Sequence, residues 1–411
     1  MSRAALMPVE EALARVIASV AGPLGEERVA LAEAFGRTLA RDVVSRRVQP
    51  PFVNSAMDGY ALIAADAARA PTRLTVVGEA AAGRPLARRL ERGEAARIFT
   101  GAPLPEGADA VAMQEVAERD GATVTLSAPV KSGDHVRRRG LDFDEGELLL
   151  PAGRSLTARD VALAAAADHA TLAVRRRPRV AILSSGDELA APGAARGPAQ
   201  IVASNALAVA GVVAAAGGEP IDLGVAPDDP AAIAERLAEA RRLGADALTT
   251  IGGASVGDHD LIRQALADAG MTLDFWRIAM RPGKPLIHGR LGAMCVLGLP
   301  GNPTSTLVCA ALFLRPLVRA LLGDPDAGAD PSEPARLGAA LPANSERKDF
   351  LRATLAEGAD GATVATPIAE QDSSLAKALA RADALLVREP GAPSAAAGAP
   401  CRILRFARLG A

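Results

Sequence analysis

Gly298-Leu299-Pro300-Gly301-Asn302-Pro303 is the stretch that decides the fold. It follows the apolar run Cys295-Val296-Leu297 and precedes a helix-like run from Thr304 to Leu322, so the pattern predicts a strand, a tight loop and a helix. The glycines let the backbone lie against a ligand, while Asn302 can cap the helix and Pro303 suits its first position. The helix start would offer N–H groups to an anion, and an ordinary strand-to-helix turn is the alternative.

A cationic loop lies just upstream of this stretch. Arg277, Arg281 and Lys284 fall between the runs Leu273-Asp274-Phe275-Trp276 and Leu286-Ile287-His288, and two prolines stiffen the segment. Guanidinium and ammonium groups held close together are typical of oxyanion sites. The loop is therefore interpreted as an oxyanion clamp, with a solvated surface turn as the alternative.

A third loop follows the strand-like run Ala247-Leu248-Thr249-Thr250-Ile251. Its sequence, Gly252-Gly253-Ala254-Ser255-Val256-Gly257, leads into Asp258-His259-Asp260 at the start of a helical pattern. The loop is not a Walker loop, because Asp258 rather than lysine follows Gly257, and its glycine spacing does not fit a dinucleotide fingerprint. The turn nevertheless leaves room for a phosphate. Carboxylates beside a phosphate favour Mg²⁺, and helix capping by Asp258 is the alternative.

Composition is that of a globular protein of several domains. The 411 residues are 49% hydrophobic and only 2% aromatic, and the formal charge of −2 gives no strong attraction to nucleic acid. Three widely spaced cysteines form no metal or disulfide pattern, and we expect a reducing, cytoplasmic location without a membrane span or signal peptide.

Periodicity predicts an α/β multidomain fold. Residues 1–44 and 141–178 are expected to form a discontinuous N-terminal domain, with helices near 8–20 and 29–39, and residues 45–140 an inserted β-rich domain. Residues 179–326 alternate strands and helices as in a doubly wound, mostly parallel sheet, whose ligands bind at the carboxyl ends of the strands. Residues 327–411 are expected to form a small C-terminal β-barrel.

Four more motifs stand in order with these loops. They are Pro51-Phe52-Val53-Asn54-Ser55-Ala56-Met57-Asp58-Gly59-Tyr60, Arg97-Ile98-Phe99-Thr100-Gly101-Ala102-Pro103-Leu104-Pro105, Arg138-Arg139-Gly140-Leu141-Asp142 and Ser184-Ser185-Gly186-Asp187-Glu188-Leu189. Over essentially its whole length the chain resembles the molybdopterin molybdenumtransferase family, to which the gephyrin E domain also belongs. The resemblance implies insertion of molybdenum from molybdate into adenylylated molybdopterin, with release of AMP.

The resemblance also implies the site residues. Those expected to be catalytic are Asp58, Thr100, Asp142, Glu188, Asp260 and Lys284. Those expected to bind substrate are Asp228, Gly252, Gly253, Ser255, Arg277, Arg281, Pro300, Asn302, Pro303, Ser305, Arg352 and Ser373. Asp228 and Asp260 are the expected Mg²⁺ ligands, and molybdate is expected near Arg281, Lys284, Ser305, Arg352 and Ser373.

Three departures from the family pattern bear on these roles. Arg277 and Arg281 stand where lysine is usual, which keeps the charge but changes its geometry. Asp168 stands in a turn where glycine is usual. Asp372 stands beside Ser373 where glycine is common, and its charge would weaken oxyanion binding unless the side chain points away.

The resemblance further implies a homodimer whose active site lies at the subunit interface, and molybdopterin adenylyltransferase is a candidate partner. Two other functions are weighed. A catalytically weak relative could bind pterin or act as a scaffold, as gephyrin does. A molybdopterin adenylyltransferase would share the doubly wound sheet but lack the surrounding domains, and an assay with ATP and molybdopterin would separate it.

Overall fold

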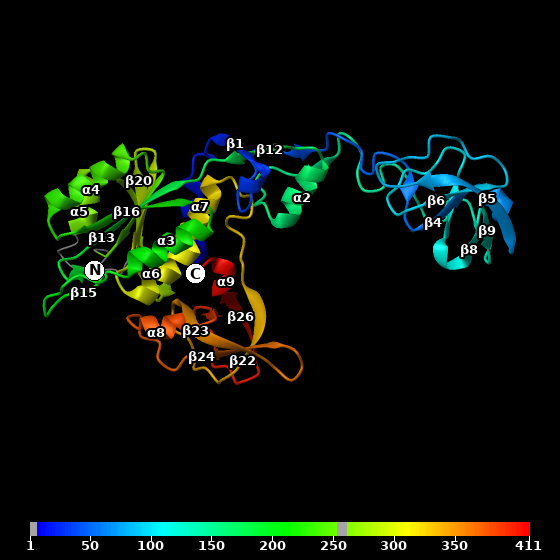
Figure 1. The fold of residues 1–411 in the computed structure, drawn as a ribbon. Coiled ribbons are helices and arrows are strands. Elements are labelled where there is room, and N and C mark those ends of the chain that lie inside the picture. The colour runs from blue at the N-terminus through cyan, green and yellow to red at the C-terminus, as the bar shows by residue number, and fades with distance from the viewer. Residues whose placement is uncertain (1–5, 253–260) are drawn as a thin grey trace.

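A six-stranded sheet with helices on both faces forms one end of the molecule in the computed structural model, which describes residues 6–252 and 261–411 (Figure 1). The strand order is β16-β13-β17-β21-β20-β18; the first four strands are parallel, and β20 runs antiparallel to both of its neighbours, β21 and β18. The strands are β13 (Arg179–Ser185), β16 (Glu219–Ala226), β17 (Ala247–Ile251), β18 (Thr272–Arg277), β20 (Pro285–Leu291) and β21 (Met294–Leu299).

Burial on both faces explains the continuous apolar runs that predicted this sheet. All residues of β17 and β21 are buried, as expected for parallel strands covered by helices on each side. The helices are α3 (Asn205–Ala215), α4 (Pro230–Arg242), α5 (Leu261–Asp268), α6 (Pro303–Cys309) and α7 (Arg315–Leu321). α3, α6 and α7 contribute to one core and α4 and α5 to the other, so the doubly wound fold is confirmed.

The helical run after the Gly298–Pro303 stretch is the most apolar of the chain. α6 continues through a π-helical segment (Ala310–Leu314) into α7. By length and composition alone, the run Pro303–Leu321 is long and apolar enough to cross a membrane. Of its most apolar window, 72% is buried inside the protein, where its side chains pack against α1 and α3. Its composition therefore suits a core helix.

The N-terminal domain is built from two distant segments of the chain. Its strand pairs are β1 (Glu26–Ala30) with β12 (Thr171–Arg175) and β2 (Val43–Val44) with β11 (Leu148–Leu150), and α2 (Ala158–Ala166) packs beside them. α1 (Val9–Ala18) lies in the first segment, but its buried side chains join the core of the sheet domain. The expected helix over residues 29–39 is wrong: this segment contains the end of β1, followed by a single 3₁₀ turn (Leu31–Glu33).

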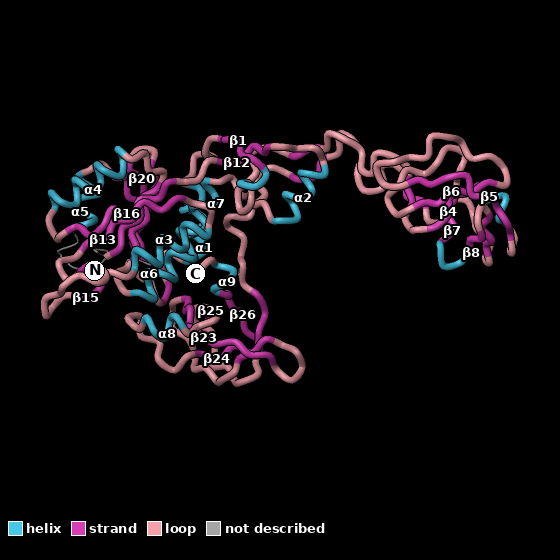
Figure 2. Tube along the Cα trace, viewed as in Figure 1, coloured by secondary structure: helices cyan, strands magenta, loops and turns pink. Residues whose placement is uncertain are grey.

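The inserted domain projects away from the rest of the molecule. Two segments without helix or strand connect it to the N-terminal domain (Figure 2), and they are hydrogen-bonded to each other, as in Gln49 N to Phe143 O at 2.9 Å. Its six-stranded sheet has the order β7-β4-β6-β5-β9-β8. These six strands are β4 (Gly59–Leu62), β5 (Thr72–Ala80), β6 (Glu94–Ile98), β7 (Ala110–Met113), β8 (Ala117–Asp120) and β9 (Thr123–Leu126). A separate antiparallel pair consists of β3 (Asn54–Ser55) and β10 (Val136–Arg137), and 3₁₀ turns lie at Ala64–Ala67 and Gln114–Val116.

The C-terminal domain is a closed five-stranded barrel, as predicted. Its strands pair in the ring β23-β24-β22-β26-β25, which closes through β23 and β25. The elements are β22 (Glu333–Leu337), β23 (Lys348–Glu357), β24 (Thr363–Pro367), α8 (Ala376–Ala380), β25 (Ala384–Arg388), β26 (Pro400–Arg405) and α9 (Phe406–Leu409). β19 (Met280–Arg281), from the cationic loop, pairs in parallel with the start of β23 and so joins the barrel to the sheet domain.

Candidate functional site

The loops predicted to bind ligand meet at one edge of the sheet. β13, β16, β17 and β21 run parallel, so the segments that follow them lie side by side at their carboxyl ends. Asp228 follows β16, and its carboxylate accepts a hydrogen bond from Ser185 Oγ at 3.0 Å. Gly252 follows β17 and lies against Gly301: a Cβ atom placed on Gly301 would be 3.6 Å from the Cα of Gly252. Glu188 comes directly before β14 (Leu189–Ala190), which pairs in parallel with β15 (Ile201–Val202), and its side chain is exposed.

A cleft of about 900 Å³ opens between this part of the sheet domain and the barrel. Lys284 and Ser305 line it from the sheet domain, and Ser373 lines it from the barrel. Arg281 also lines it, from the strand β19 that joins the two domains. The structure thus brings together four of the five residues predicted near molybdate.

The two cations of the clamp differ in their surroundings. Arg281 forms an ion pair with Asp349, whose carboxylate accepts from the guanidinium Nε at 3.1 Å and is 3% exposed. The ammonium group of Lys284 has neither a hydrogen bond nor an ion pair within residues 6–252 and 261–411, and it is exposed to the cleft. Lys284 is therefore the clamp cation that is free to bind an anion.

Close packing beneath the clamp fixes its path. Gly283 has a φ of +104°, and a Cβ at this position would lie 2.5 Å from Cys309 Sγ of α6. Only glycine tolerates both the backbone angle and this approach. The apolar helix α6 therefore holds the cationic loop against the cleft.

The helix start and the barrel loop hold each other. Asn302 occupies the N-cap position of α6, but the expected side-chain cap is wrong: its Nδ2 donates instead to Ser373 Oγ at 2.8 Å. The Thr304 N–H donates to the Ser373 carbonyl at 3.0 Å, and Pro303 takes the first helical position as predicted. Asp372 accepts from the backbone N–H of Ser374 at 2.8 Å and from its hydroxyl at 2.6 Å, so its carboxylate is held by its own loop.

Arg352 does not line the cleft. Its side chain is buried, and the guanidinium donates to Glu370 O at 2.9 Å and to Leu375 O and Thr304 Oγ1 at 3.3 Å each. Burial lowers the pKa of Arg352, and the charge of Asp372 opposes this effect. These contacts span the loop that carries Ser373, so Arg352 supports this side of the cleft from behind.

Arg277 also lies outside the cleft lining. Its guanidinium stacks on the ring of Trp276 at 3.8 Å from the centroid, and its Nε is buried without a hydrogen-bond partner. Gly253, Ser255 and Asp260, which were predicted to bind substrate or metal, lie outside the described residues.

Asp58 and Thr100 form a second cluster, in the inserted domain. Asp58 Oδ1 accepts from both the backbone N–H and the hydroxyl of Thr100, each at 2.8 Å. The bond from the Thr100 N–H, followed by that from its hydroxyl, lowers the pKa of Asp58 and keeps it ionised. Arg97 stacks on Tyr60 and Phe99 beside this pair. Gly59, next to Asp58, is required because a Cβ there would lie 1.8 Å from Ala112 O.

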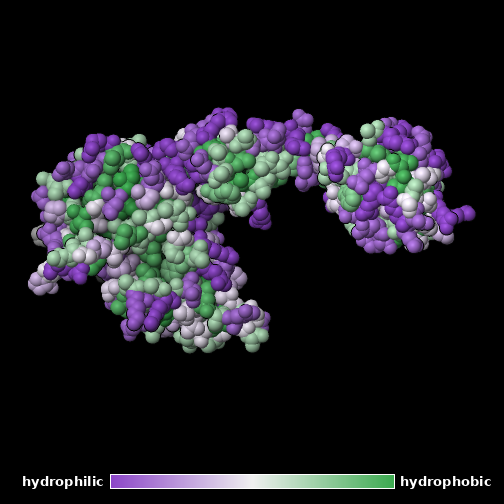
Figure 3. All heavy atoms as spheres, viewed as in Figure 1, coloured by the Kyte–Doolittle hydropathy of each residue, from purple (hydrophilic) through white to green (hydrophobic). Residues whose placement is uncertain are grey.

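The predicted site residues therefore fall into separate groups. Lys284 and Asp228 belong to the sheet domain, and Asp58 and Thr100 belong to the inserted domain. These two domains lie at opposite ends of the molecule (Figure 1). The space-filling view shows an open concave side between the barrel and the inserted domain (Figure 3). Asp142 lies in the connection itself, where its N–H donates to Gln49 O at 3.0 Å and its side chain is exposed.

Sequence reasoning missed three residues that build the cleft. Asp349 pairs with Arg281, Asn344 ties a cleft loop to the end of β25, and Gln371 binds the backbone of Arg352 through bonds of 3.0 and 2.9 Å. Asp349 lies only three positions before the predicted Arg352, and this closeness in the sequence was a signal for it. Asn344 and Gln371 act on backbone groups, which leaves no pattern in the sequence.

Fold and cleft together define a multidomain α/β protein with a cleft lined by cations between its sheet domain and its barrel. Three family models match in order: the MoeA N-terminal region (domain I and II) over residues 7–167, a probable molybdopterin binding domain over residues 181–320, and the MoeA C-terminal region (domain IV) over residues 334–406. The chain belongs to the molybdopterin molybdenumtransferase family, a family of enzymes, which confirms the resemblance.

Curated relatives and solved structures agree with this assignment. The molybdopterin molybdenumtransferase of Haemophilus influenzae is 34% identical over 405 residues, covering 98% of this chain and 100% of the relative. That of a Nostoc species is 42% identical over 304 residues, covering 72% and 70%. The molybdopterin biosynthesis MoeA protein of Pyrococcus horikoshii superposes with a TM-score of 0.81 at 32% identity, covering 98% of this chain and 99% of that one.

Proposed function

We propose that this protein transfers molybdenum from molybdate to adenylylated molybdopterin and releases AMP. The observation that carries the proposal is the cleft that joins the free cation Lys284 to the hydroxyls of Ser305 and Ser373, in a chain whose full-length relatives are named molybdopterin molybdenumtransferases. Molybdate is a tetrahedral dianion, and such ions are bound by a cation together with directional donors. The decisive assay measures AMP release from adenylylated molybdopterin with and without molybdate.

Each side of the cleft would have its own task. Lys284 supplies uncompensated charge to molybdate, while Ser305 at the start of α6 and Ser373 on the barrel loop orient its oxygens. Arg281, neutralised in part by Asp349, fixes the position of the clamp between the domains. The matches to the N-terminal and C-terminal regions favour this function over the adenylyltransferase alternative, which shares only the sheet domain.

Mg²⁺ is the proposed metal, and Asp228 would be one of its ligands. Within the described part of the chain no group of three or more His, Cys, Asp or Glu side chains is assembled for a metal. Mg²⁺ needs only one or two carboxylates when substrate phosphate and water complete its shell, so an exposed carboxylate at the ligand edge fits the ion. When bound, Mg²⁺ would neutralise charge on the adenylyl phosphate; Asp260 is the second proposed ligand.

Complete sites would require a homodimer. Asp58 and Thr100 lie far from Lys284 in the elongated chain (Figure 1), so a site containing both groups is best built from the inserted domain of one subunit and the sheet and barrel of its partner. A two-fold dimer would then carry two such sites. Delivery of the adenylylated substrate by contact with molybdopterin adenylyltransferase, in the cytoplasm, is part of the same proposal.

Replacing Lys284 tests the oxyanion site. Lys284→Ala should raise the molybdate concentration required for half-maximal AMP release by roughly tenfold or more, because a charged hydrogen bond typically contributes about 1.5–3 kcal/mol. The variant should keep its melting temperature, since the side chain has no polar partner among the described residues. Lys377→Ala, at an exposed lysine of α8 outside the cleft lining, is the matched control. An unchanged molybdate dependence in folded Lys284→Ala would remove this residue from the site.

Amide substitutions test the metal. Asp228→Asn and Asp260→Asn should each abolish Mg²⁺-stimulated AMP release while binding of adenylylated molybdopterin, measured by calorimetry, persists. An asparagine at 228 still accepts from Ser185 Oγ, so the fold should hold. The control is Asp229→Asn, since the N-cap of α4 tolerates either residue. Overlapping Mg²⁺ titrations of wild type and both variants would show the assignment to be wrong.

A further inference from the structure

We propose that Arg347 forms a second oxyanion subsite, on the barrel wall of the cleft and separate from the Lys284 clamp. Its ligand is a tetrahedral oxyanion, which could come from molybdate itself or from a phosphate group of the pterin substrate. The pterin source rests on the proposed function, whereas the molybdate source is tested by binding alone.

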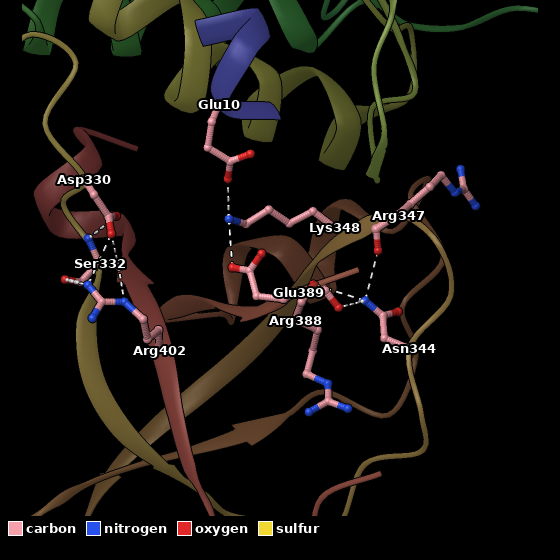
Figure 4. Close-up of polar contacts among 9 residues, drawn as sticks. All are labelled: Glu10, Asp330, Ser332, Asn344, Arg347, Lys348, Arg388, Glu389 and Arg402. Atoms are coloured by element: carbon pink, nitrogen blue, oxygen red, sulfur yellow. Dashed lines mark hydrogen bonds and ion pairs between the residues drawn. The ribbon is translucent and has the colours of Figure 1, made fainter. Parts of the chain in front are cut away.

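Arg347 lines the cleft and the next residue does not. Arg347 comes directly before β23, and both Arg347 and Asp349 line the cleft, whereas Lys348 between them does not. Lys348 binds instead to Glu10 of α1 at 2.6 Å and to Glu389 at 2.8 Å (Figure 4). Lys348 therefore binds the barrel to α1, whereas Arg347 lines the cleft.

Arg347 is left without a counter-ion. Among the described residues that line the cleft, the carboxylate is that of Asp349, and it is already bound to Arg281. Among the described residues, the guanidinium of Arg347 has no hydrogen bond and no ion pair, although its side chain is only partly exposed. Arg388, the other barrel arginine in the lining, donates to the carbonyls of Pro342 and Pro393 and so stabilises the barrel loops that contain them.

The backbone that carries Arg347 is rigidly held. Asn344 Nδ2 donates to the carbonyls of Arg347 at 2.9 Å, Arg388 at 3.0 Å and Glu389 at 2.9 Å (Figure 4). In the same view the Arg347 side chain extends away from this cluster. The fixed backbone limits the region that the guanidinium can reach, and the guanidinium keeps all its N–H donors available for an anion.

The charge of the cleft calls for such a ligand. Among the described residues, its lining contains Arg281, Lys284, Arg347 and Arg388 against the single carboxylate of Asp349, so the net formal charge of these groups is four minus one, or +3, in a protein whose total is −2. Lys284 alone does not balance a pterin phosphate together with molybdate. A guanidinium on the opposite wall suits a phosphate or molybdate oxygen pair through two parallel N–H bonds.

Titration calorimetry on the full-length protein tests the subsite, with sodium molybdate and molybdopterin as separate probes. Arg347→Ala should weaken binding of one probe by about tenfold or more, and Arg347→Lys should recover part of the loss because it keeps the charge but not the planar fork. Arg347→Gln, which keeps most of the stem, replaces the alanine variant if that variant is unstable. Arg381→Ala, at an exposed arginine of the barrel outside the lining, should leave both affinities unchanged.

The two probes distinguish the sources. A loss confined to molybdate would identify the metal oxyanion as the ligand, and a loss confined to molybdopterin would identify its phosphate; either result supports the subsite. The subsite proposal would be overturned if Arg347→Ala bound both probes as tightly as the wild type does. It would also be overturned if the wild-type protein bound neither probe. Failure of molybdenum insertion in the wild type would refute the proposed function, while the molybdate titration would still decide on Arg347.

Discussion

Mixed dimers of two inactive variants should recover roughly a quarter of wild-type activity. Asp58→Asn and Lys284→Ala homodimers are each expected to be inactive, because every composite site would contain one defect. After subunit exchange a heterodimer has one site with both defects and one with neither. Random equal mixing makes half of the dimers heterodimers, and half of their sites are intact, which gives the quarter. AMP release before and after exchange measures it.

The control uses two defects from the same cluster. Asp58→Asn mixed with Thr100→Ala should recover nothing, because both inserted domains are defective and every site receives one of them. Exchange itself is followed by native mass spectrometry with a tag on one variant. If exchange is complete and the Asp58→Asn and Lys284→Ala mixture stays at background, each site is built within one chain and the composite architecture is refuted.

The position of Asp58 relative to Lys284 illustrates where sequence reasoning stops. The motifs around both residues are readable because they combine glycine, proline and charge at fixed spacing, and the structure places each on the predicted domain type. Nothing in the sequence fixes the direction in which an insertion joined by two extended segments projects. That direction depends on backbone bonds such as Gly140 N to Pro50 O at 3.0 Å, which any residue can make.

The elements predicted correctly share long-range support. β17 and β21 are continuous apolar runs that are buried on both faces, so their sequence pattern agrees with their packing. α6 begins at Pro303, and proline is favoured at the first position of a helix. The segment 29–39 failed because its spacing of apolar residues also suits a strand, and pairing of β1 with β12, distant in the chain, decided the outcome. Asp168 adopts a φ of +70°, so an aspartate keeps the backbone turn for which glycine was expected.

Site chemistry was predicted at the level of residue type but not of role. A sequence shows that Arg281, Lys284 and Arg352 are cations, and it cannot show that the first is paired with Asp349, the second is free and the third is buried. Arginines are seldom fully buried, so the motif alone favoured a solvent-facing ligand at position 352. The roles follow from partners contributed by other elements of the fold.

Arg352→Ala should therefore act differently from Lys284→Ala. Removing the buried guanidinium leaves the carbonyls of Glu370 and Leu375 without a donor and opens a cavity behind the Ser373 loop, so we expect the free energy of unfolding to fall by about 3 kcal/mol. Molybdate binding should weaken as well, because Ser373 loses its support. Scanning calorimetry measures the first effect and molybdate titration the second.

The exposed pair Arg402–Asp330 of the same barrel supplies the control. Arg402→Ala breaks an ion pair whose side chains are both more than half exposed, and such pairs typically contribute less than about 1 kcal/mol. It should change neither stability nor molybdate affinity to a comparable extent. A stable Arg352→Ala variant that loses molybdate affinity as Lys284→Ala does would instead make Arg352 a direct ligand, and it would require the barrel loop to open when the oxyanion binds. Loss of both properties in Arg352→Ala, with only the affinity lost in Lys284→Ala, separates the residue that holds the site from the residue that binds in it.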